Sequence, residues 1–97
     1  MPEPSLHITV LDLQGDRLAR AEQELRRNLR HYKLHAHVVC LACGLEIARS
    51  GYSGMTPVLL VEEHPFSIGR ELSPALLQEL CRRLALRQTA QSENESS

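Results

Sequence analysis

The first 41 residues carry the pattern that most restricts the fold: two β-branched segments on either side of an amphipathic helix. Residues 6–11 (LHITVL) and 35–41 (HAHVVCL) are short and rich in β-branched side chains, which predicts strands. Residues 17–32 predict a helix, with Asp16 as its N-cap and one face formed by Leu18, Leu25, Leu29 and Tyr32. A strand, a helix and a strand of these lengths form a βαβ unit, so the two strands should run parallel with a right-handed crossover.

The middle of the chain adds two more strands to this unit. Residues 44–50 predict a short helix that stops at Gly51, and the apolar run 58–61 (VLLV) predicts a buried strand. Residues 62–66 (EEHPF) predict a turn, and residues 67–70 a short strand in a hairpin with the preceding one. These two strands should therefore be antiparallel.

The last predicted element is a second long helix. Ser73 has the character of an N-cap and Pro74 suits the first helical position. An apolar stripe follows at helical spacing, made of Leu76, Leu77, Leu80, Cys81 and Leu84. The fold class is thus α/β, a four-stranded mixed sheet in the order β-α-β-(α)-β-β-α with helices packed on its faces. We expect one domain over residues 1–87 and a disordered tail over 88–97.

Composition excludes several classes of function. The chain has 97 residues, 42% apolar and only 3% aromatic, so a core of Leu, Val, Ile and Ala fits one domain but a base-stacking surface does not. A net charge of -1 gives no general attraction to nucleic acid or to a membrane. No membrane-spanning run and no secretory signal pattern is present, so we expect a cytoplasmic protein whose three cysteines are thiols.

Residues 47–84 resemble the second half of a small thioredoxin-like protein (the thioredoxin/glutaredoxin fold). The resemblance depends on a short helix ending in Gly, a Thr-Pro step, two strands, a Gly and a helix begun by Ser-Pro; here these are Ala48–Gly51, Thr56–Pro57, Val58–Val61, Ile68–Arg70 and Ser73–Pro74. It implies that the Thr56–Pro57 bond is cis. It also implies that the backbone before the proline can pair with an extended partner.

The sequence departs from that family where its chemistry would be expected. The redox cysteines of the family lie between the first strand and the first helix, but residues 12–16 (DLQGD) contain no cysteine. The disulfide exchange of the family therefore cannot be transferred to these positions. We expect a non-catalytic binding or accessory module for a protein or peptide partner, which would contact a rim made of residues 12–16, 40–43 and 55–57. The candidate contact residues in this rim are Asp12, Gln14, Gly15, Met55, Thr56 and Pro57.

The spacing C-x-x-C at Cys40 and Cys43 supports an alternative, a thiol-disulfide redox protein with a displaced cysteine pair. Parallel strands end at the same edge of a sheet, so this pair should lie beside the cysteine-free segment. Cys43 would come just before a helix N-terminus, where a thiolate is stabilised. The plainer interpretation is that both cysteines are small packing residues, as we expect for Cys81 in the last helix.

A third hypothesis is metal binding through His35, His37, Cys40 and Cys43, since zinc takes four nitrogen or sulfur ligands. Strand geometry opposes it, because His37 and Cys40 have opposite parity and should point to opposite faces. We therefore favour no metal and no cofactor. A homodimer formed through the exposed edge of the strand 35–41 is a further expectation.

Overall fold

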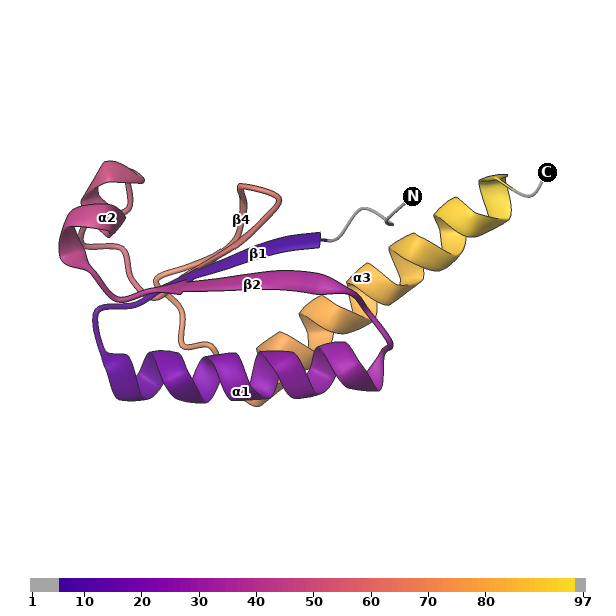
Figure 1. The fold of residues 1–97 in the computed structure, drawn as a ribbon, viewed down its shortest axis with the longest axis horizontal. Helices are drawn as coiled ribbons and strands as arrows, with labels where there is room; N and C mark the ends of the chain where they lie inside the picture. The colour runs from indigo at the N-terminus through magenta and orange to yellow at the C-terminus, as the bar shows by residue number, and fades with distance from the viewer. Residues whose placement is uncertain (1–5, 96–97) are drawn as a thin grey trace.

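The computed structural model describes residues 6–95, which form a four-stranded mixed sheet and three helices (Figure 1). The strand order is β2-β1-β3-β4. β1 and β2 are parallel, whereas β1 with β3 and β3 with β4 are antiparallel. The elements are β1 (Leu6–Leu11), α1 (Gly15–His31), β2 (Ala36–Leu41), α2 (Gly44–Arg49), β3 (Val58–Val61), β4 (His64–Ile68) and α3 (Pro74–Glu95). The predicted mixed α/β architecture is confirmed.

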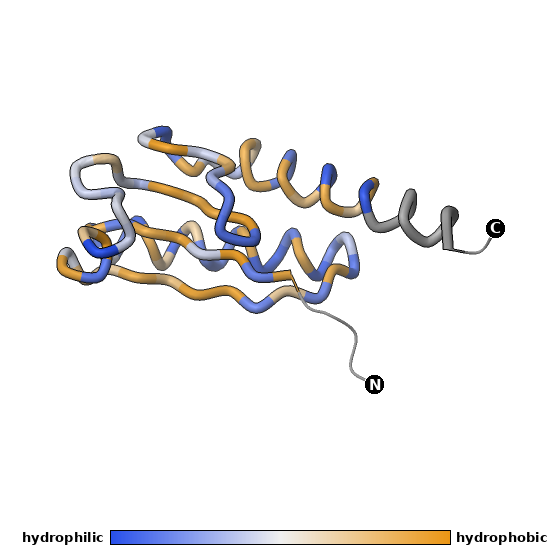
Figure 2. The backbone as a smooth tube through the Cα atoms, turned by 90° about the horizontal axis from the view of Figure 1, so that it is seen from above, coloured by the Kyte–Doolittle hydropathy of each residue, from blue (hydrophilic) through white to orange (hydrophobic). Residues whose placement is uncertain are grey.

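The helices cover the two faces of the sheet unequally. α1 and α3 contact each other and lie together on one face, and the short α2 lies over one end of the other face (Figure 1). The strands are largely hydrophobic along their length, as the tube in Figure 2 shows. Because side chains alternate between the faces of a strand, β1 sends Ile8 and Val10 to the larger cluster and Leu11 to the smaller cluster, which includes Ile47 of α2.

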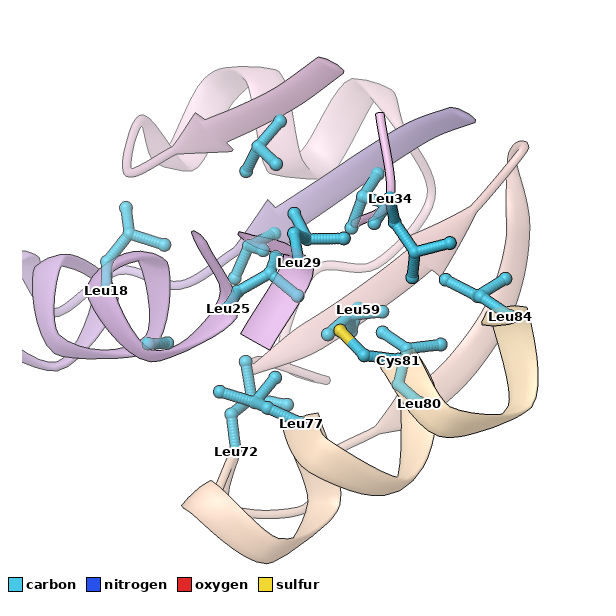
Figure 3. Packing of buried hydrophobic residues seen from close by; sticks show 14 residues of the cluster. Leu18, Leu25, Leu29, Leu34, Leu59, Leu72, Leu77, Leu80, Cys81 and Leu84 are labelled. Atoms are coloured by element: carbon cyan, nitrogen blue, oxygen red, sulfur yellow. The ribbon is translucent and has the colours of Figure 1, made fainter. Parts of the chain in front are cut away.

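The larger cluster is built from the apolar faces of α1 and α3 (Figure 3). Leu25 of α1 and Leu77 of α3 are fully buried, and both belong with Leu59 of β3 to this cluster. The stripes predicted for both helices are confirmed, including the buried position of Cys81. Ser73 also acts as predicted, because its Oγ accepts a hydrogen bond from the Leu76 N–H at 3.2 Å, one turn into α3.

The predicted boundary of β4 is wrong by three residues. β4 begins at His64 rather than at Ser67, because the turn after β3 needs only Glu62 and Glu63. Both turn residues have positive φ, 51° and 68°, the combination that a tight two-residue hairpin requires. Pro65 then lies within an edge strand, where proline is tolerated because its neighbour on one side is solvent.

The helical backbone of α3 continues past the point where its apolar stripe ends. The sequence predicts a tail from Gln88 onward, whereas α3 extends to Glu95 and projects beyond the sheet (Figure 1). A helix can propagate without a buried face once it has been nucleated, since each added residue gains one backbone hydrogen bond. Residues 96–97 lie outside the described part. In residues 6–95 no helix is both long and apolar enough to cross a membrane.

Candidate functional site

The three segments of the rim meet at one end of the sheet, at the left of Figure 1. β1 and β2 are parallel and in register, so Leu11 lies beside Leu41. The Asp12 N–H extends this pairing by donating to the Leu41 carbonyl at 3.1 Å. β3 starts at the same end, since Val58 lies opposite Leu11. Pro57 therefore lies next to Asp12, as the sequence predicts for the two segments.

Asp12 is the buried polar group of the rim. Its Oδ2 accepts a hydrogen bond from Arg17 Nε at 2.5 Å and its Oδ1 accepts one from Arg17 Nη2 at 2.8 Å. Oδ1 also accepts the Gln14 N–H at 3.1 Å. The side chain of Asp12 is 1% exposed, whereas that of Arg17 is 42% exposed. A bidentate guanidinium–carboxylate pair with one buried partner fixes the geometry of the loop between β1 and α1.

The N-terminus of α1 is organised by this pair rather than by the predicted cap. Gln14, not Asp16, is the N-cap, and its side chain makes no capping hydrogen bond. Asp16 lies in the first turn, where a carboxylate interacts favourably with the helix dipole. The hydrogen bonds from Arg17 hold the pKa of Asp12 below its ordinary value, so Asp12 is ionised near neutral pH. A second anion, such as a thiolate, would be electrostatically disfavoured beside it.

The segment before β3 is held by short backbone contacts. The Thr56–Pro57 peptide bond is cis. The Met55 N–H donates to the Tyr52 carbonyl at 3.0 Å, and the Gly69 N–H donates to the Pro57 carbonyl at 2.8 Å. Gly69 has a φ of 71°, which favours glycine, and a Cβ there would lie 3.6 Å from the Met55 carbonyl oxygen. The end of β4 therefore fixes residues 55–57 beside Asp12.

Apolar side chains are exposed around the rim. Leu13 is 56% exposed, Leu45 60%, Met55 46% and Ile68 44%. A Cβ on Gly44 would lie 3.5 Å from Leu13 Cδ2, so the loop after β1 reaches the start of α2. Ile68 lies opposite Val58, the first residue of β3. Of the five large hydrophobic residues exposed in the described part, four thus surround one end of the sheet; the fifth is Leu86 in α3.

Cys40 faces α1 and is a poor nucleophile. Its side chain packs against the larger cluster and is half-buried. Burial, together with the nearby Glu22 carboxylate and against the opposing effect of Arg26, raises the pKa of its thiol to about 11. At neutral pH almost all of this thiol is protonated, whereas the thiolate is the reactive form.

Cys43 differs from Cys40 in position and exposure. It is exposed and is the N-cap of α2, as predicted, but its side chain makes no capping hydrogen bond. Both thiols are free, and so is that of Cys81. Cys40 packs into the cluster under α1, whereas α2 lies on the opposite face of the sheet. Cys40 and Cys43 therefore lie three residues apart at the same edge of the sheet, but no disulfide joins them.

The structure does not gather the four proposed metal ligands. His37 contacts His7 of the neighbouring strand, with ring centroids 5.8 Å apart, while Cys40 packs against the opposite face. Among residues 6–87, whose side chains are described, no group of three or more His, Cys, Asp or Glu side chains is placed to hold a metal ion. The separation arises because successive side chains of a strand point to opposite faces, and His37 and Cys40 are an odd number of residues apart.

Sequence reasoning found the rim but missed several of its side chains. The predicted helix begins at Arg17, but the helical pattern assigns this residue no contact. Its position five residues after Asp12 is the signal that could indicate the ion pair. Leu13 carried a signal, because it is the one large apolar residue in the segment 12–16. Leu45 and Ile68 carried none, since an apolar residue in a short helix or strand is ordinarily interpreted as core.

Comparisons of this chain with protein-family models, curated proteins and solved structures give no significant match in any of the three.

Proposed function

We propose that this chain is a thioredoxin-like domain that binds an extended, apolar segment of a partner protein at the rim and does not catalyse disulfide exchange. The observation that carries the proposal is the group of exposed apolar residues around the rim: Leu13, Leu45, Met55 and Ile68. The element order and the sheet order β2-β1-β3-β4 are compatible with that fold.

The chemistry of the rim supports binding over catalysis. The loop before α1 contains no thiol, and its Asp12 is paired with Arg17 in the first turn of α1. The nearest cysteine on the neighbouring strand, Cys40, has a pKa raised to about 11 by burial. Disulfide exchange by a C-x-x-C pair needs an accessible thiolate and a second thiol that closes the disulfide. Cys43 is exposed, but Cys40 packs into the larger cluster.

The exposed apolar side chains support a partner of matching character. They come from four separate segments, so a single extended peptide could cover several of them across the end of the sheet. Charges near the rim are of both signs and partly paired: Arg17 bonds Asp12, and Arg49 lies 3.6 Å from Glu46. This gives no strong preference for an acidic or a basic partner, so apolar contact should supply most of the affinity.

The experiment selects peptides from a phage-displayed library of random 12-residue sequences and measures their affinities by fluorescence polarisation. Selected peptides should carry alternating apolar residues. Leu13→Ser and Met55→Ser should each weaken binding about tenfold, because burying the exposed half of such a side chain contributes roughly 1–1.5 kcal/mol. Leu86→Ser is the matched control, since Leu86 is equally exposed but lies in α3.

Three results would overturn the proposal. The first is that Leu86→Ser weakens binding as much as the rim variants do. The second is a concentration-dependent dimer that Leu13→Ser dissociates, which would make a second copy of the chain the occupant of the rim. The third is turnover in a reductase-coupled insulin reduction assay that Cys40→Ser or Cys43→Ser abolishes, which would establish the redox alternative instead.

A further inference from the structure

A cavity lies away from the rim, between the β3–β4 hairpin and α3. It has a volume of about 430 Å³ and is lined by Val61, Glu62, His64, Pro65, Phe66, Leu80, Arg83, Leu84 and Arg87. This volume lies within the range of about 300–1,000 Å³ that is typical of sites for small molecules. The cavity is independent of the proposed rim, which is at the other end of β3.

The inner wall of the cavity is apolar. Leu80 and Leu84 of α3 form its floor (Figure 3), but they are only 2% and 6% exposed. Most of the accessible apolar surface therefore comes from Val61, Pro65 and Phe66 of the hairpin. Val61 and Phe66 are half-buried residues of the hairpin that pack against the larger cluster. An apolar group of a ligand placed here would be removed from water against side chains that are already ordered.

The outer wall carries an excess of positive charge. Arg83 and Arg87 lie one turn apart on α3 and both line the cavity. Arg83 uses only its Nε for Glu79, at 2.9 Å, so its terminal amino groups can donate to another acceptor. Arg87 forms no ion pair with the described side chains of residues 6–87.

The neighbouring carboxylates do not cancel this charge. Glu62 lines the cavity but its Oε1 accepts the His7 N–H at 3.0 Å, which holds it toward β1. Glu79 has a pKa lowered to about 2 by hydrogen bonds from Arg82 and Arg83, so it stays ionised and shared between them. Among the lining residues, Arg83 and Arg87 stand against the single carboxylate of Glu62, and this positive excess favours a ligand with an anionic head.

We propose that this cavity is a binding site for a small amphipathic organic anion, with its apolar body against Val61, Pro65 and Phe66 and its carboxylate at Arg83 and Arg87. Guanidinium groups bind carboxylates through two parallel hydrogen bonds, which suits a monocarboxylate at the mouth of an apolar cavity. No covalent step is involved.

The test uses decanoate as the probe, below the concentration at which it forms micelles, and decanol as the uncharged probe of equal chain length. Backbone amide signals of residues 61–64, 66 and 80–87 should shift on titration with decanoate, and the dissociation constant follows from the shifts. Decanol should bind about tenfold more weakly, because a charge-assisted hydrogen bond is worth roughly 1.5–3 kcal/mol and part of this is lost to solvent at an exposed site.

Arg87→Gln should weaken decanoate binding about fivefold to tenfold on the same argument. Arg82→Gln is the matched control, because Arg82 lies on the same helix and pairs with Glu79 but does not line the cavity. Circular dichroism establishes that both variants are folded. Leu13→Ser should leave decanoate affinity unchanged, which separates this site from the proposed rim.

The inference is overturned if decanol binds as tightly as decanoate, or if Arg82→Gln and Arg87→Gln weaken binding equally. It is also overturned if the shifted amides cluster at residues 12–16 and 55–56. Association with vesicles of phosphatidylglycerol without binding of monomeric decanoate would replace the small-molecule site with a membrane contact.

Discussion

Replacing Asp12 by Asn tests whether the Asp12–Arg17 pair holds the rim together. The substitution keeps the size of the side chain and the oxygen that accepts the Gln14 N–H at 3.1 Å. It removes the negative charge and puts an amide N–H₂ group in place of Oδ2, so the 2.5 Å hydrogen bond from Arg17 Nε is lost. The 2.8 Å hydrogen bond from Arg17 Nη2 to Oδ1 is kept, but its acceptor is no longer charged. The perturbed side chain is 1% exposed, so water cannot readily replace the lost hydrogen bond.

The magnitude follows from these contacts. Charge-assisted hydrogen bonds contribute roughly 1.5–3 kcal/mol each, but Arg17 is 42% exposed and recovers part of its hydration when the pair breaks. We therefore expect the free energy of unfolding to fall by about 2 kcal/mol. For a domain of this size that corresponds to a decrease in Tm of roughly 8–16 °C.

The assay is urea unfolding at pH 7 followed by circular dichroism, with Asp16→Asn as the matched control. Asp16 is exposed in the first turn of α1, so its neutralisation should cost only about 0.3–1 kcal/mol. Because the folded pKa of Asp12 is depressed, its stabilisation is present above the unfolded pKa of about 3.9 and is lost as the pH falls through the lower folded value. Equal losses for Asp12→Asn and Asp16→Asn, or a difference from wild type that does not shrink as the pH falls below about 3.9, would refute the reasoning.

Three further predictions concern the core and the thiols. Leu25→Ala should lower the free energy of unfolding by about 2–5 kcal/mol in urea titrations, because Leu25 is fully buried, whereas a loss below 1 kcal/mol would contradict the packing described. Ser67→Ala should be neutral or stabilising in the same assay, since the buried Ser67 Oγ has no hydrogen-bond partner among the described residues. Iodoacetamide at pH 8 should label the exposed Cys43 before Cys40, whose pKa is raised to about 11, and before the buried Cys81; mass spectrometry gives the order, and early labelling of Cys40 would contradict it.

The architecture could be predicted because the apolar periodicities change clearly along the chain. A helix buries Leu18, Leu25 and Leu29 on one face, and a strand inside the sheet buries the apolar run 58–61. No other secondary structure would bury these residues together. Parallel pairing of β1 and β2 then follows from the helical crossover that joins them, and the right-handed rule sets the face on which α1 lies. The start of β4 could not be predicted, because it depends on Glu62 and Glu63 adopting positive φ, which glutamate has no local preference to do.

The sequence predicts where the segments of the candidate site lie, but it does not predict the ion pair that the site contains. Residues 12–16, 40–43 and 55–57 were expected at one end of the sheet, and the strand registers bring them there. The ion pair between Asp12 and Arg17 was missed, because a loop carboxylate and a helix arginine each have many solvated alternatives. Its formation depends on the burial of Asp12 between β1 and its neighbouring strands, which is a tertiary property.

The rim and the cavity lie at opposite ends of β3, which makes their proposed roles separable. β3 begins at Val58, beside the rim, and ends at Val61, which lines the cavity. Three residue steps of about 3.3 Å place these ends roughly 10 Å apart along a strand that is buried in the sheet. The two sites are joined by an ordered strand and not by a loop. A ligand bound at one site is therefore not expected to change the structure of the other. A selected rim peptide should therefore bind with the same affinity whether or not decanoate is present, and a strong mutual dependence would mean that the two ligands compete for one surface.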